Sequence, residues 1–228
     1  LSSETDPESS VRMLRQYSVD GVIVASSTLS PDFARAFRDA RVPVVHSFGR
    51  LAETPDVDVV GIDNTACGRM AAQTLIDRGY RRIAFLGGPE TATSTQDRAS
   101  GFLHAAMAQP QVDVTHSFAS AYSFDAGRVE MTKLLMTDPA EAYFCGDDVI
   151  AIGALSAVQS AALSVPGDVG LIGLNDMEMA RWENIDLTTI RQPVPAIIDH
   201  SIDLVAAMLE QPDAMPSARM FPCEIVER

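Results

Sequence analysis

The chain has 228 residues, enough for one large domain or two small ones, and its 46% hydrophobic content excludes an intrinsically disordered protein. It carries 17 basic and 31 acidic residues, a formal net charge of −14. Because phosphate backbones repel such a surface, the composition argues against nucleic-acid binding by these residues alone.

The first part of the chain alternates helical and strand-like segments. A short helix is predicted over residues 7 to 18, and its apolar face carries Val11, Leu14 and Tyr17. Ser30 is expected to cap a second helix, with Pro31 at the first helical position. Short apolar strands are predicted at GVIVA, which begins at Gly21, at PVVH (43–46), and at DVVGI, which ends at Ile62.

The middle of the chain continues this alternation. A helix is predicted to begin at Asp63 or Asn64, and Gly79 is its C-terminal stop. The strand RIAFLGG follows, and its glycines open a loop before a helix that carries Arg98. A weak strand lies within residues 112–118, and Ser123 is expected to cap the next helix.

Residues 142–177 are predicted to form a strand, a helix and a second strand. AYFC and VGLIGL are continuous apolar runs, which is typical of parallel strands covered on both faces. In open sheets of this kind, ligands bind beyond the carboxyl ends of the strands. A binding site is therefore predicted at the polar residues that follow the two strands, which are Asp147, Asp148, Asn175 and Asp176.

The last part of the chain contains a brief strand, LTTI (187–190), which RQP interrupts. A long helix from about Val194 to Leu209 follows, and a final short strand lies within MFPCEIVER. Because strands alternate with helices almost throughout, the predicted fold class is α/β with parallel sheets.

The cysteines and histidines give no sign of a metal or a disulfide framework. The three cysteines are far apart, which favours a reducing compartment, and the four histidines have no ligand spacing. We therefore expect no metal and no cofactor. No apolar run reaches the roughly 18 residues of a membrane span, and no signal peptide is found. The residues concerned are Cys67, Cys145 and Cys223, and His46, His104, His116 and His200.

Several segments resemble, in order and spacing, the effector-binding core of the LacI/GalR family of bacterial transcription regulators, which is itself similar to periplasmic sugar-binding proteins. The resemblance covers most of the chain, and VPGDVGLIGLND and LTTIRQP favour the regulators over the transport proteins. The segments are VDGVIVASS, VPVVHSFGR, DNTACGRMAAQTLIDRGYRRIAFLGGP with DRASGF behind it, CGDDVIAIGALSAVQSAALSVPGDVGLIGLNDM, and DLTTIRQP.

The resemblance implies two Rossmann-like lobes with parallel sheets, joined by three crossovers, as in type I periplasmic binding proteins. The N-terminal lobe would contain residues 1–63 plus 193–220, and the C-terminal lobe residues 64–191 plus 222–228. Nothing in the chain resembles the family's helix-turn-helix. The family's first strand and helix also have no counterpart, which we interpret as a sequence that begins inside the domain.

The resemblance also implies which residues contact the effector. Arg98 leads, because a guanidinium offers several donors in a fixed fork that suits adjacent hydroxyls. Its removal is expected to change the unliganded melting temperature very little. Asp147 and Asn175 supply hydrogen-bonding groups, although Asp147 also suits a helix N-cap and Asn175 a turn. Asp148 is expected to serve the structure of the lobe as much as the ligand.

Four further residues complete the expected site. They are Ser94 in the loop before Arg98, Tyr122 at a position where relatives carry an aromatic contact, Gln192 at a hinge, and Phe48 after the PVVH strand. Many sugar-binding relatives have Asp where this chain has Phe48. An aromatic ring there either stacks on a sugar face or replaces a lost hydrogen-bond partner.

We therefore expect the effector-binding and dimerising part of a ligand-responsive bacterial transcription regulator, a repressor. A small polar effector, a sugar or a derivative, would bind between the lobes and alter the spacing of DNA-binding heads outside this chain. The expected protein is a cytoplasmic homodimer without membrane contact. Helix faces around Met70 to Leu75 and Ile198 to Met208 are candidate dimer surfaces, although core burial explains them equally well.

Two other functions compete with this expectation. A solute-binding protein of a sugar transporter would share the fold and the cleft, but would carry a secretory signal. An enzyme would use Asp147 and Asp148 as an acid–base pair, yet neighbours in sequence do not by themselves face each other across a bond. The chain has no nucleophile elbow, phosphate loop or dinucleotide fingerprint, so no enzymatic activity is expected.

Overall fold

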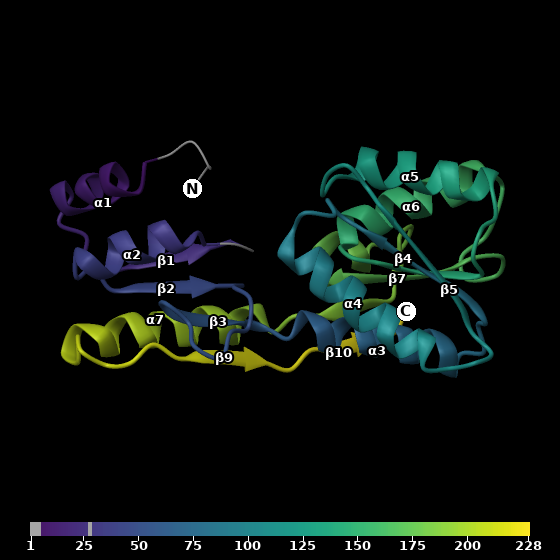
Figure 1. The fold of residues 1–228 in the computed structure, drawn as a ribbon. Helices are drawn as coiled ribbons and strands as arrows, with labels where there is room; N and C mark the ends of the chain where they lie inside the picture. Colours follow the sequence, from purple (N-terminus) through teal and green to yellow (C-terminus); the bar gives the residue numbers. More distant parts are fainter. Residues whose placement is uncertain (1–5, 27–28) are drawn as a thin grey trace. The chain divides into compact units, whose positions relative to one another are not determined.

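The computed structural model describes residues 6–26 and 29–228, and the chain divides into two compact units. The first unit contains Leu1–Asp63 and Pro193–Pro222, and the second contains Asn64–Gln192 and Cys223–Arg228. The chain therefore passes between the units three times. Each unit has a mainly parallel sheet with helices packed on it, so the α/β fold class is confirmed (Figure 1).

The sheet of the first unit is entirely parallel, with the strand order β1-β2-β3-β9. β2 and β3 are buried along their whole length, as expected for a sheet that is covered on both faces. The strands are β1 (Val22–Ala25), β2 (Val44–Ser47), β3 (Asp58–Ile62) and β9 (Ala218–Phe221).

Helices cover both faces of this sheet. α1 (Pro7–Gln16) and α2 (Pro31–Asp39) pack on one face, where Phe33 and Phe37 belong to the same core cluster as the strand residues Val24 and Val44. α7 (Val194–Glu210) packs on the other face, where the Ser201 hydroxyl lies 2.7 Å from that of Ser47. The prediction of Ser30 as the N-cap of α2 is confirmed, because its hydroxyl accepts a hydrogen bond from the Phe33 amide.

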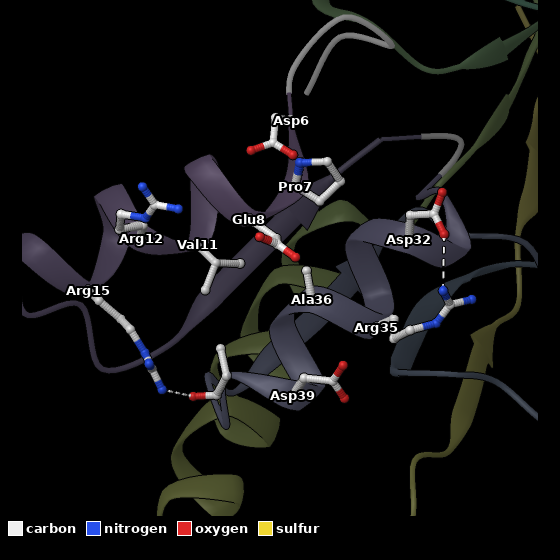
Figure 2. A pocket seen from close by; sticks show the side chains of 11 residues that line it. Asp6, Pro7, Glu8, Val11, Arg12, Arg15, Asp32, Arg35, Ala36 and Asp39 are labelled. Carbon is white, nitrogen blue, oxygen red and sulfur yellow. Dashed lines mark hydrogen bonds and ion pairs between the residues drawn. The ribbon is translucent and has the colours of Figure 1, made fainter.

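A hollow of about 600 Å³ lies between α1 and α2 in the first unit (Figure 2). Its walls are mostly charged, and Asp32 and Arg35 on α2 form an ion pair at 3.4 Å. Arg15 of α1 donates to the backbone carbonyl of Ala40, which links the two helices. The prediction that Tyr17 lies on the apolar face of α1 is wrong, because α1 ends at Gln16 and the Tyr17 side chain is 77% exposed.

The sheet of the second unit has six strands in the order β10-β8-β7-β6-β4-β5. All its neighbouring pairs are parallel except β10 and β8, which are antiparallel. The strands are β4 (Arg82–Gly87), β5 (Asp113–Phe118), β6 (Ala142–Cys145), β7 (Gly170–Asn175), β8 (Thr189–Arg191) and β10 (Glu224–Val226).

Two helix pairs cover the second sheet. Phe102 of α4 stacks near Phe85 and Phe144 on one face, with ring centroids 6.2 Å and 5.8 Å apart. On the other face, Leu86 and Tyr143 belong to a core cluster with residues of α5 and α6. The helices are α3 (Asn64–Asp77), α4 (Thr93–Met107), α5 (Phe124–Met136) and α6 (Asp148–Ser160), and a 3-10 turn spans Glu178–Arg181.

Glycines allow the paired helices to touch backbone to backbone. A Cβ placed on Gly101 of α4 would lie 2.0 Å from the carbonyl oxygen of Thr65 on α3, and one on Gly68 of α3 would lie 2.1 Å from that of Arg98. The pair α5 and α6 meets in the same way at Gly127 and Gly153. These contacts fix the start of α3 against the turn of α4 that carries Arg98.

The end of the chain differs from the prediction of one final strand within MFPCEIVER. β9 ends at Phe221 in the first sheet and β10 begins at Glu224 in the second. Pro222 lies between them, and its missing N–H cannot continue a ladder. The candidate dimer faces also differ in exposure, because Leu75 is 1% exposed whereas Ile198 and Ile202 are 44% and 53% exposed.

Candidate functional site

Polar side chains gather at the carboxyl ends of three neighbouring strands in the second unit. β4, β6 and β7 lie side by side and run parallel, so their C-terminal ends meet at one edge of the sheet. Arg98 lies on α4, the helix that follows β4, whereas Asp147 directly follows β6 and Asn175 ends β7. The structure therefore brings together the three residues that the sequence singled out first.

Arg98 is held in place by the elements around it. It is only 7% exposed, its Nε donates to Oδ1 of Asn64 at 2.8 Å, and one Nη donates to the carbonyl of Gly146 at 2.5 Å. Among the described residues, the second Nη has no hydrogen-bond partner. A fixed guanidinium with donor capacity left suits a hydroxyl or carboxylate on a ligand.

Asp147 has two roles within the protein. Its Oδ1 accepts a hydrogen bond from the Val149 amide at 2.8 Å, so it is the N-cap of α6, and its Oδ2 accepts one from Nδ2 of Asn175 at 2.8 Å. Burial raises the pKa of Asp147, while the Val149 amide and the charge of Arg98 act in the opposite direction. Each carboxylate oxygen keeps a second lone pair, which a ligand hydroxyl can use.

Asn175 connects Asp147 to the end of β8. Its Oδ1 accepts a hydrogen bond from Nε2 of Gln192, and its Nδ2 donates to Asp147. The four groups from Gln192 to the α6 cap thus form one chain of hydrogen bonds. Such a chain orients the side-chain amide, because each end of the amide has a partner of the opposite kind.

Asp148 is fully buried and has its own partners. One carboxylate oxygen accepts a hydrogen bond from the Thr189 hydroxyl at 2.5 Å and the other accepts one from the Met177 amide at 2.8 Å. Burial raises the pKa of Asp148, and both hydrogen bonds oppose that rise. These contacts tie α6 to β8 and to the loop after β7, which accounts for the structural role expected of it.

Ser94 and Tyr122 lie together at the start of α4. Ser94 belongs to the first turn of this helix and not to the preceding loop, where it was predicted. The Tyr122 hydroxyl lies 2.6 Å from that of Thr95 and 3.2 Å from that of Ser94. The Tyr122 ring lies so close to Gly88 that a Cβ there would be 2.4 Å from it. Gly88 therefore lets the ring pack on the loop, and the tyrosine ties the β5–α5 connection to the start of α4.

Phe48 belongs to the first unit. It follows β2 with a φ of +63°, which is rare for a bulky residue, and its amide donates to the Val60 carbonyl at 2.6 Å. Nearby, the ring of His46 is buried beside Gly49 and its Nε2 bonds the Ser26 carbonyl at 2.8 Å. Burial lowers the pKa of His46, partly offset by that hydrogen bond.

Sequence reasoning missed Asn64 and Thr95. Asn64 holds Arg98, and Thr95, which is 1% exposed, holds Tyr122. The available signal was position: each lies in the first turn of a helix that follows a strand. No group of His, Cys, Asp or Glu within the described residues is arranged to hold a metal ion, and no described helix has the length and apolarity of a membrane span.

Comparison with known proteins assigns the chain to a family. Residues 72–228 match the model of the periplasmic binding protein-like domain, which is more than half of the chain. The chain belongs to the periplasmic binding protein-like family. Three proteins that are similar to this chain in sequence are named as transcription regulators.

Two curated relatives illustrate the similarity. The transcriptional repressor CytR of Escherichia coli is 28% identical over 212 residues, which cover 92% of this chain and 62% of the repressor. The transcriptional repressor PurR of Vibrio cholerae is 30% identical over 227 residues, covering 96% and 66%. The chain therefore spans less than two thirds of the length of these relatives.

The fold comparison agrees. The solved complex of the transcriptional regulator CelR with cellobiose has a TM-score of 0.85 at 26% identity, over 96% of this chain and 68% of CelR. A LacI-family regulatory protein from Chloroflexus aggregans has a TM-score of 0.86 at 27% identity, over 100% of this chain and 83% of its own. The first is named as a transcriptional regulator and the second as a LacI-family protein, in agreement with the sequence resemblance.

Proposed function

We propose that this chain is the effector-binding part of a ligand-responsive transcription repressor, and that its effector is a small hydroxyl-bearing molecule of the sugar class. The observation that carries the proposal is the strand-end cluster of Arg98, Asp147 and Asn175. It offers one spare guanidinium donor group beside carboxylate and amide oxygens. A sugar hydroxyl both donates and accepts, so it can use both kinds of group at once.

The names of similar proteins support the same proposal. CytR and PurR are named as repressors, and CelR is solved with cellobiose. A transporter's solute-binding protein would share this fold, but the similar proteins above are regulators. Ser94, Tyr122 and Gln192 are proposed as further contacts from the second unit, and the role of Phe48, which belongs to the first unit, stays a prediction.

We also propose that operator DNA is bound by a part of the protein outside these 228 residues and that the protein works as a homodimer in the cytoplasm. The net charge of −14 fits a domain that leaves phosphate recognition to another segment. An effector switches such a protein only if it binds two arrangements with different free energy. Sedimentation of the chain at several concentrations tests the dimer.

A thermal-shift screen against sugars, nucleosides and amino acids tests the effector class. A compound present at about 100 times its Kd stabilises the folded state by about 2.7 kcal/mol. For a protein of this size, that corresponds to a rise in melting temperature of about 5–10 °C. We expect such a rise with at least one sugar.

The Arg98→Lys variant then tests the site. Lysine keeps the charge but loses the fork, so the sugar-induced rise should largely disappear. Arg128→Lys is the matched control, because Arg128 is an exposed arginine on α5. If Arg98→Lys responds to the sugar as fully as Arg128→Lys does, the effector does not bind at this cluster.

A further inference from the structure

The turn that ends β7 has a backbone conformation that residues other than glycine rarely adopt. Asn175 and Asp176 are consecutive, and both have positive φ, +132° and +55°. Asn and Asp tolerate such values better than other residues, but two in succession persist only where surrounding contacts hold them. Asn175 is a residue of the proposed effector site, so whatever holds this turn also sets the direction of its amide.

Three arginines hold the turn through Asp176. The Asp176 side chain is 1% exposed, and it accepts hydrogen bonds from Nε of Arg191 at 2.6 Å, from an Nη of Arg181 at 2.9 Å, and from Arg228. Although burial opposes it, these arginines lower the pKa of Asp176 to about 2. The carboxylate therefore stays charged, and the cluster stays intact, at any physiological pH.

The register of two strands connects this cluster to the site. β7 and β8 are parallel neighbours, and Asn175 is paired with Arg191. Each strand end thus presents two side chains to the other: Asp176 bonds Arg191, and Asn175 bonds the next residue, Gln192. The Asp176–Arg191 bond belongs to the cluster of arginines around Asp176. The Asn175–Gln192 bond belongs to the chain of hydrogen bonds that leads to Asp147.

We propose that Asp176 and Arg191 are positioning residues, whose ion pair holds the β7 exit turn so that Asn175 presents its amide between Asp147 and Gln192. Neither residue needs to touch the effector. For effector affinity this inference rests on the proposed function; for the orientation of Asn175 it stands on the contacts alone. Arg191 and Gln192 immediately precede the second passage of the chain between the units. The ion pair of Asp176 and Arg191 therefore also links the residues before that passage to the site.

Nuclear magnetic resonance tests the orientation without any ligand. The sequence contains three asparagines, Asn64, Asn175 and Asn184, so a sample labelled with ¹⁵N-asparagine gives three side-chain amide pairs. In Arg191→Met, we expect the Asn175 pair to change its chemical shift and its hydrogens to exchange about fivefold to tenfold faster, as expected for loss of one hydrogen bond. The Asn64 and Asn184 pairs should not change.

Two variants separate positioning from a general loss of stability. Arg191→Lys keeps the charge and should restore part of the Asn175 signal. Glu224→Gln removes the other partner of Arg191, an exposed ion pair at 2.9 Å, and should leave the Asn175 pair unchanged. Arg191→Met should still fold, because Asp176 keeps Arg181 and Arg228. If Arg191→Met lowers the melting temperature while the Asn175 pair keeps its shift and exchange rate, the cluster is only structural and the proposal is wrong.

A second arm uses cellobiose, the sugar in the CelR complex, as the probe. If cellobiose binds the wild-type protein, its Kd should rise about fivefold to tenfold in Arg191→Met and stay unchanged in Glu224→Gln. An unchanged Kd in Arg191→Met would contradict the proposal. If cellobiose does not bind the wild-type protein, that result counts against this sugar as effector, and the asparagine signals still decide on Asp176 and Arg191.

Discussion

Replacing Gly101 by alanine should separate α4 from α3 and disturb the site through Arg98. A Cβ at this position would lie 2.0 Å from the Thr65 carbonyl oxygen and 2.8 Å from its carbonyl carbon. Both are backbone atoms, so no flexible side chain can move aside. Because an ordinary contact needs about 3.4 Å, the helices would have to move apart by more than 1 Å.

The cost follows from this overlap. Overpacking in a well-packed core costs about 1–3 kcal/mol, and the gain in helix propensity from Gly to Ala returns roughly 1 kcal/mol at most. Since the clash is between two backbones, we expect a net loss of about 1–2 kcal/mol, or a fall in melting temperature of about 2–8 °C.

Urea unfolding followed by fluorescence suits this test, because the chain has a single tryptophan, Trp182, and it lies in the second unit. Ser100→Ala is the matched control, since Ser100 is exposed on the same helix and alanine there adds only helix propensity. Equal unfolding midpoints for Gly101→Ala and Ser100→Ala would refute the close approach of the two backbones.

Three further predictions concern the buried polar side chains Arg98, His46 and Asp176. Arg98→Ala should lower the unliganded stability by about 1.5–3 kcal/mol, measured by urea unfolding, because it leaves the oxygens of Asn64 and Gly146 without their donors; equal stability would mean that these bonds are not made in solution. Burial lowers the pKa of His46 in the folded state, so the unfolded chain binds the proton first and the stability should fall as the pH drops below about 6.5. In His46→Gln this part of the fall should be absent when melting temperatures are measured between pH 7.5 and 5.5. If the melting temperatures of the variant and the wild type fall in parallel over this range, the prediction is wrong. The pKa of Asp176 is lowered to about 2, so its charge contributes about 2 kcal/mol of stability that is present above pH 4 and is lost as the pH falls toward 2. The loss of stability in Asp176→Asn relative to the wild type should therefore become smaller over that range. A stability difference that stays constant with pH would contradict the ion pairs of Asp176 with the three arginines.

The strands and helix caps could be predicted because their signals are local. Apolar runs marked the parallel strands, and Ser30 and Ser123 both cap helices as expected, since each hydroxyl accepts a hydrogen bond from an amide three residues later. Gly79 ends α3 with a φ of +95°, a value that glycine adopts without strain. That the polar residues after β6 and β7 lie together could also be predicted, because the carboxyl ends of neighbouring parallel strands meet at one edge of the sheet.

What the sequence could not supply was the partner of each side chain. Arg98 was expected to be removable at little cost to stability, but it is buried and bonded to Asn64, which lies 34 residues earlier in the chain. Asp176 was only noted as part of a polar cluster, and its three arginines come from positions up to 52 residues away. Such pairings depend on strand order and helix packing, which no local pattern encodes.

The most direct test of the central claim is a titration of the labelled protein with a sugar that stabilises it, followed by ¹H–¹⁵N correlation spectra. If the effector binds at the strand ends of the second unit, the largest changes will be at the Arg98 Nε–H, the Asn175 side-chain amide and the backbone amides around Asp147. If those signals stay in place while others move, the effector binds elsewhere and the account of the site is wrong.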